Sequence, residues 1–182
     1  MPIAHTTRHQ VLIVDGYNVI RNNKRYAGLG TDYDGSSAWN NAREAVINDA
    51  ALLAGKDYEK CTVVFDGAGN VLSKGTPKKQ AGIDVIFSPA GVSADSVIEK
   101  LAHDARERGF EVVVVSSDFT IQSTVFGGGV TRMSAAGFAS AGDELEETWK
   151  DEKDKPVVKN TLGERLDPST RAKLEAMLNG NK

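Results

Sequence analysis

The chain has 182 residues, which is enough for one ordinary domain with a sizeable core and a small appendage. A hydrophobic share of 40% and a charged share of 26% are typical of a water-soluble globular protein and exclude a disordered chain; no apolar run reaches the roughly 18 residues of a membrane span. The formal charge of −3 argues against tight non-specific binding of nucleic acid by bulk charge, although a local basic surface stays open.

Short aliphatic runs alternate with longer segments of helical character, which predicts an α/β fold with a mostly parallel sheet covered by helices on both faces. In chain order, the predicted elements are a strand at 11–15, a helix at 36–55, strands at 62–66 and 83–87, a helix at 93–109, a strand at 111–118, a short helix at 118–127, a weaker strand at 129–133 and a helix at 134–150. About five strands are therefore expected.

The composition changes after residue 150, where charged residues and turn signals replace the periodic pattern. We therefore expect one domain at 1–150 and a charged arm at 151–182, with a short helix that opens at Asp167 and Pro168 and runs through Leu178. The first residues carry no visible secretory signal, so the expected compartment is the cytoplasm, without a membrane. A lone cysteine, Cys61, excludes an internal disulfide and a cysteine-based metal cluster and suits a small core residue.

Three of the four strong strands end in an aspartate: Asp15, Asp66 and Asp118. Because parallel strands end at one edge of an open sheet, where ligands bind, these carboxylates are expected to face one crevice. Asp95, at the start of the helix after the third strand, points toward the same edge. Carboxylates gathered in this way raise one another's pKa unless a cation or a set of hydrogen bonds compensates, and a metal ion is the economical explanation.

The expected ligands are all oxygen, which favours Mg²⁺ or Mn²⁺ over Zn²⁺. Such ions activate a water and stabilise charge on a phosphate, which predicts metal-assisted hydrolysis of a phosphodiester. Glu99, one turn beyond Asp95, is an optional ligand or an exposed partner of a nearby cation. The simpler alternative for each strand-end aspartate is a helix cap or a turn. With histidines only at 5, 9 and 103, no Ser-His-Asp arrangement can be assembled, and a serine hydrolase is rejected.

Polar and basic residues near the same edge suit nucleic acid. Asn18 can hydrogen-bond a carboxylate or a phosphate, Ser116 and Ser117 can orient Asp118, and Tyr17 and Tyr26 are candidates for stacking on bases. Cations in the loops after the strands could hold an RNA backbone, although such residues are often just solvated; they are Arg21, Lys24, Arg25, Lys74, Lys78, Lys79 and Arg132.

The segments LIVDGYNVI, VVFDG, VIFSPAGVSADSVIEKLA and SSDFTIQSTVFGGGVTRMSA, in this order and spacing, resemble the YacP-like branch of the NYN domain family, relatives of PIN-domain ribonucleases. The resemblance covers residues 10–150. It implies a PIN-like three-layer fold, a Mg²⁺ or Mn²⁺ site of acidic residues, and endonucleolytic cleavage of RNA, with messenger RNA as substrate and the ribosome as partner. By position, Asp15 and Asn18 match the first family motif, Asp95 the helix acid and Asp118 the acid after the fourth strand, while Asp66 falls at a further matching acid.

The leading hypothesis is thus a metal-dependent endoribonuclease in which Asp15, Asp95 and Asp118 hold the ion. A non-catalytic RNA- or ribosome-binding module of the same fold is the alternative, because the net charge is acidic and Ser96 stands where family members often have a second acid. That serine also leaves the number of metals open. A phospho-acceptor signalling domain, the third hypothesis, would normally have paired acids after the first strand, which this chain lacks.

Overall fold

A computed structural model describes residues 9–30, 37–118 and 130–154 of the chain. By its internal contacts the chain divides into two units, residues 1–147 and 148–182. The short helix expected at 118–127 lies outside the described residues, as does the arm expected at 151–182 except for residues 151–154, which continue the helix α6 (Ala135–Asp154); these predictions stay open. The expected domain boundary at residue 150 falls within the described helix α6 and stays a prediction.

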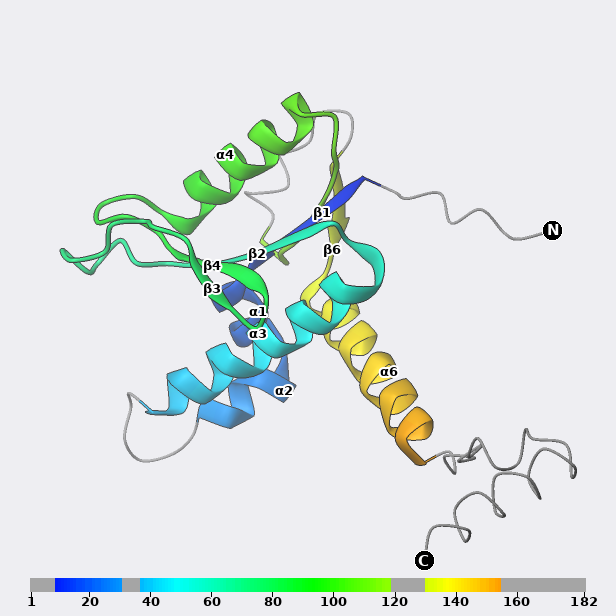
Figure 1. The fold of residues 1–182 in the computed structure, drawn as a ribbon. Helices are drawn as coiled ribbons and strands as arrows, with labels where there is room; N and C mark the ends of the chain where they lie inside the picture. Colours follow the sequence, from blue (N-terminus) through cyan, green and yellow to red (C-terminus); the bar gives the residue numbers. More distant parts are fainter. Residues whose placement is uncertain (1–8, 31–36, 119–129, 155–182) are drawn as a thin grey trace, which may run out of the picture. The chain divides into compact units, whose positions relative to one another are not determined.

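A mostly parallel sheet forms the centre of the first unit (Figure 1). Within the described residues it has six strands, in the order β3-β4-β2-β1-β5-β6. All neighbouring pairs are parallel except β3 and β4, which are antiparallel. The strands are β1 (Gln10–Asp15), β2 (Lys60–Phe65), β3 (Lys78–Gln80), β4 (Ile83–Phe87), β5 (Glu111–Val115) and β6 (Val130–Met133).

Helices cover both faces of this sheet because the central strands are apolar on both sides. On β1, Val11 and Ile13 pack in a core with α4, whereas Leu12 and Val14 pack in a second core with α1, α2, α3 and the beginning of α6. Figure 1 shows α4 on one side of the sheet and α3 on the other. The helices are α1 (Gly16–Asn22), α2 (Lys24–Ala27), the short 3₁₀ helix η1 (Gly28–Gly30), α3 (Ser37–Asp57), α4 (Ala94–Glu107) and α6 (Ala135–Asp154).

The predicted fold class is confirmed, and each of the five predicted strands is present. The sixth, β3, was missed because its three residues are exposed and lack apolar alternation. It pairs with β4 through a tight turn in which Ala81 and Gly82 both have positive φ. The strand expected at 111–118 ends at Val115, and beyond Ser116 the N–H groups of Ser117 and Asp118 donate to side chains instead of to a neighbouring strand.

The segment after β1 also differs from expectation, because it forms α1 and α2 instead of a loop. Gly16 is needed there for space: a Cβ at this position would overlap the ring of Phe65. Cys61 is buried, as its strand-like surroundings predicted. Among the described residues, no helix combines the length and the apolar composition needed to cross a membrane.

Candidate functional site

The carboxyl ends of β1, β2 and β5 bring the predicted acids to one edge of the sheet. Asp15 is the last residue of β1, Asp66 directly follows β2, and Asp118 comes three residues after β5. Asp95 lies in the first turn of α4, which follows β4. Since these four strands are neighbours in the sheet, residues that are far apart in sequence approach one another here.

Asp15 is held firmly at the start of α1, for which it is the N-cap. Its Oδ1 accepts a hydrogen bond from the backbone N–H of Asn18 (3.2 Å), and its Oδ2 accepts one from the hydroxyl of Ser116 (3.4 Å). The residue is only 7% exposed. The simpler interpretation as a helix cap is therefore correct for Asp15, but a cap does not require such burial of a charge.

Electrostatics link Asp15 to the other acids. Burial, the largest cause, raises the pKa of Asp15 to about 6; its two hydrogen bonds oppose this rise, and the charges of Asp95 and Asp118 add to it. Asp95 has a raised pKa as well, through partial burial first and then through the charges of Asp118 and Asp66. The structure thus connects the four predicted strand-end and helix acids electrostatically through Asp95, on which Asp66 acts as well, whereas Glu99 is exposed one turn further along α4.

The loop that carries Asp118 is fixed by side chains. Ser117 donates its backbone N–H to Oδ1 of Asn18 (2.7 Å), and its hydroxyl accepts the backbone N–H of Ala135 at the start of α6 (3.2 Å). The N–H of Asp118 donates to the Ser116 hydroxyl (3.1 Å). The amide oxygen of Asn18 therefore accepts a backbone hydrogen bond, whereas the expected bond to a carboxylate or phosphate, which the amide N–H would donate, stays a prediction.

The donor chemistry at this edge fits a hard divalent cation. The candidate ligands are carboxylate oxygens, and the two neighbouring charges that act on Asp15 are both negative, so a cation would relieve repulsion. In the described part of the chain, however, no three His, Cys, Asp or Glu side chains already have the spacing of metal ligands. The chemistry and the negative charge of the side chains therefore fit a divalent cation, and the choice of ligands stays a prediction.

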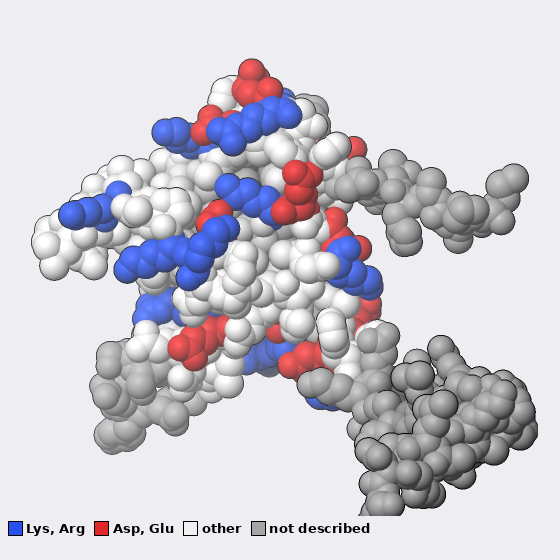
Figure 2. Space-filling model, viewed as in Figure 1, with Lys and Arg blue, Asp and Glu red and all other residues white. Residues whose placement is uncertain are grey.

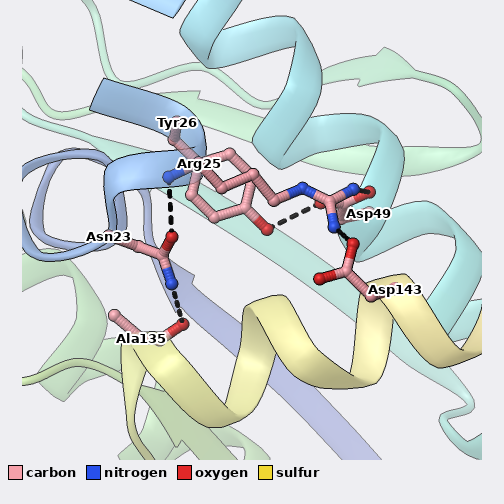
Figure 3. Close-up of polar contacts among 6 residues, drawn as sticks. All are labelled: Asn23, Arg25, Tyr26, Asp49, Ala135 and Asp143. Atoms are coloured by element: carbon pink, nitrogen blue, oxygen red, sulfur yellow. Dashed lines mark hydrogen bonds and ion pairs between the residues drawn. The ribbon is translucent and has the colours of Figure 1, made fainter. Parts of the chain in front are cut away.

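The predicted RNA-binding cations have different surroundings. Arg21 and Lys24 are exposed, on α1 and α2. Arg25 instead forms ion pairs with Asp49 (3.3 Å) and Asp143, and Figure 3 shows its side chain directed between these two residues. Tyr26, fully buried, donates its hydroxyl to Asp49 (2.6 Å). The expectation that Tyr26 stacks on bases is wrong, because its ring has no exposed surface.

The remaining cations are exposed on three other segments. Lys74 lies in the loop after β2, and Lys78 and Lys79 lie in β3, where Lys79 pairs with Asp84 (3.0 Å). Figure 2 shows that the loops projecting at the left of the view are blue and white on the face seen. Arg132 is exposed too, but its Nε donates to the backbone oxygen of Ser116 (3.1 Å), so this arginine also supports the loop before Asp118.

An aromatic group beside Asp15 was missed by the sequence reasoning. Tyr17 contacts Trp39 and Phe65 edge to face, with ring centroids 5.4 and 5.1 Å apart, and Phe65 stacks on Phe87 at 5.3 Å. Arg43 donates to the hydroxyl of Tyr17 (2.8 Å). The four rings are too far apart along the chain to give a periodic signal, and only knowledge of the strand order could have grouped them.

Comparison with known proteins identifies a family. A family model described as YacP-like NYN domain matches residues 12–179. The chain is 34% identical over 127 residues to a Bacillus subtilis protein described as uncharacterized protein YacP, and the match covers 69% of this chain and 70% of that protein. The crystal structure of Rae1 (YacP) from Bacillus subtilis has a TM-score of 0.64 and 26% identity, covering 94% of this chain and 95% of that one. The crystal structure of a point mutant of the same protein gives the same TM-score and identity.

Proposed function

Because this chain belongs to the YacP-like NYN domain family, we propose that it is a metal-dependent endoribonuclease that hydrolyses phosphodiester bonds of messenger RNA in association with the ribosome. Membership of the family supports a ribonuclease-type function. The proposal goes further in three respects: the cation, internal cleavage, and the choice of messenger RNA and ribosome. The resemblance of the four sequence motifs supports each of these.

One observation carries the catalytic part of the proposal: Asp15 is buried beside two further carboxylates that raise its pKa. Three aspartates, Asp15, Asp95 and Asp118, would hold Mg²⁺ or Mn²⁺, with Asp66 as a further ligand. A bound ion of this kind lowers the pKa of a water and stabilises charge on the phosphate and the leaving oxygen. Protons compete with the cation for the carboxylate of Asp15, whose pKa lies at about 6, so the affinity for the cation should rise between about pH 5 and pH 7.

The chain's own residues would orient the site and bind the substrate. Asn18 and Ser117 fix the loop before Asp118, and Ser116 connects this loop to Asp15. Exposed cations, among them Lys74 and Lys78, would bind phosphates of the RNA backbone and so position the strand. Arg25 contributes to this less than expected, because it is engaged by Asp49 and Asp143.

A circular RNA substrate tests internal cleavage directly, since only an endonuclease can open a circle. The full chain should linearise an unstructured circular RNA with Mn²⁺ or Mg²⁺ and leave it intact in EDTA. The variant Asp15→Asn should reduce the rate by at least about 100-fold, because it removes a ligand charge without changing shape. The matched control is Asp104→Asn, an exposed aspartate further along α4, which should cleave like wild type.

The alternative is a non-catalytic RNA- or ribosome-binding module. It is favoured by Ser96, which stands where family members often have a second acid and whose backbone N–H and hydroxyl are both hydrogen-bonded to Ser93 at the N-cap of α4. Calorimetry separates the two functions without the right RNA. Wild type should bind Mn²⁺ and Asp118→Asn should not. If the circular RNA stays intact with Mg²⁺ and with Mn²⁺, in the absence and in the presence of ribosomes, the endonuclease is excluded and the binding module takes its place.

A further inference from the structure

We propose that Trp39, Arg43 and Phe87 form a binding surface for an unpaired base of RNA beside the acidic site, an inference that rests on the proposed function and adds the form of its substrate. The surface is built on a row of rings, Trp39, Tyr17, Phe65 and Phe87, which come from α3, α1, β2 and β4. Arg43 connects the two ends of the row, because it lies four residues after Trp39 on α3, on the same face of that helix, and its guanidinium lies over Phe87.

The row is exposed only at its two ends. Phe65 in the middle is fully buried and Tyr17 is half-buried, but Trp39 is 39% exposed and Phe87 38%. These two rings therefore present apolar surface that a flat ligand could cover, and covering it would be favourable. The buried rings hold the outer ones in place, which lowers the entropy cost of binding a flat ligand against them.

Two guanidinium groups accompany the rings. Arg43 lies over Phe87, with its Cζ 5.7 Å from the ring centroid, and is fixed by its hydrogen bonds to Tyr17 and Asn40. Arg21 lies over the ring of Tyr17 at 5.9 Å. Exposed aromatic rings together with planar cations are the groups on which unpaired bases stack, and the cations also attract the phosphates.

The position of this surface decides in favour of RNA as its occupant. Tyr17 follows Asp15 by two residues in the same turn of chain, and Gly16 between them lies against Phe65 because only a glycine leaves room for its ring. A base on this surface would therefore belong to a nucleotide close to the phosphate held at the acidic site. Stacking requires a base that is free of its partner, so the preferred substrate is single-stranded.

Tryptophan fluorescence gives a direct test, because the chain has only two tryptophans, Trp39 and Trp149. In the full chain carrying Trp149→Phe, the emission comes from Trp39 alone. Titration in EDTA with an unlabelled, unstructured RNA 12-mer should quench this emission, whereas the same RNA annealed to its complement should leave it nearly unchanged. The difference is expected because only an unpaired base can stack on the exposed indole of Trp39.

Affinity measured by anisotropy, with a labelled RNA in the same buffer, completes the test. Trp39→Ala should weaken binding of the single strand by about tenfold and binding of the duplex by less than about twofold. Trp39→Phe should retain most of the affinity, and the matched control Trp149→Ala should bind like wild type. Thermal unfolding should show that Trp39→Ala remains folded, since the side chain is only partly buried.

The outcomes also distinguish this inference from the nuclease. Equal affinity of Trp39→Ala and wild type for the single strand, or an equal loss for strand and duplex, would overturn the base-binding surface; the first result leaves a protein partner as the occupant. Quenching of Trp39 in a protein that never cleaves RNA would keep the surface and reject the nuclease. Cleavage that survives in Trp39→Ala with unchanged KM would keep the nuclease and reject the surface.

Discussion

Replacing the buried acid by its amide should stabilise the protein, with a pH dependence that identifies the cause. The pKa of Asp15 lies at about 6 in the folded chain, above its ordinary value of 3.8. A raised pKa means that the folded state favours the protonated form, so its contribution to stability is complete below about pH 3.8 and is lost as pH rises through 6. The amide introduced by Asp15→Asn has no such proton to lose and keeps its hydrogen-bonding capacity toward Asn18 and Ser116.

The size of the effect follows from the shift. A rise from 3.8 to about 6, at about 1.36 kcal/mol per pKa unit, corresponds to about 3 kcal/mol. Urea unfolding in EDTA should therefore show the free energy of unfolding of Asp15→Asn gaining up to about 3 kcal/mol on wild type between about pH 4 and pH 7.5. Asp104→Asn should show a difference that is small at every pH. A constant difference in the free energy of unfolding between Asp15→Asn and wild type across this range would mean that the acid titrates alike in the folded and unfolded chains, and its pKa would then not be raised by folding.

Three further predictions concern the loop, the ion pairs and the basic surface. Asn18→Ala removes the acceptor for the N–H of Ser117, so it should lower the free energy of unfolding by about 1 to 2 kcal/mol. The same variant should bind Mn²⁺ more weakly in calorimetry. Unchanged metal affinity would show that the position of the loop does not depend on this hydrogen bond. Arg25→Ala leaves Asp49 buried without its cation and should cost about 3 kcal/mol in urea unfolding, with RNA affinity little changed per folded molecule. Lys74→Ala should leave stability unchanged but reduce the slope of log affinity for RNA against log salt by about one, measured by anisotropy; an unaltered slope would place this lysine outside the RNA path.

The sequence could predict the edge of the sheet at which the acids meet, because the information is local. An aliphatic run that ends in aspartate marks both a buried strand and a polar end, as at Asp15, and the rule that parallel strands end together supplies the rest. Asp95 was placed by an equally local signal, the Ser93 cap of α4. The fold class and the family, each confirmed, rest on such short-range patterns.

What the sequence could not predict depends on contacts between distant residues. The hydrogen bond from Ser117 to Asn18 joins positions 99 residues apart, and no sequence pattern near either residue predicts it. Arg25 looked like a surface cation because its partners, Asp49 and Asp143, lie on α3 and α6, far along the chain. Charge in a loop is thus a weak guide to binding until the pairing of each cation is known.

The burial of Asp15 shows how local structure and function are connected at this site. As an N-cap, Asp15 could lie exposed and stabilise α1 equally well, so its burial beside like charges costs stability that the helix does not recover. A cation that binds only the folded chain recovers about 2.7 kcal/mol at 100 times its dissociation constant, which is close to the cost worked out above. Added Mn²⁺ should therefore stabilise wild type at about pH 7.5 and leave Asp15→Asn unchanged. If both proteins respond alike, the ion binds elsewhere, and the burial of Asp15 needs another cause.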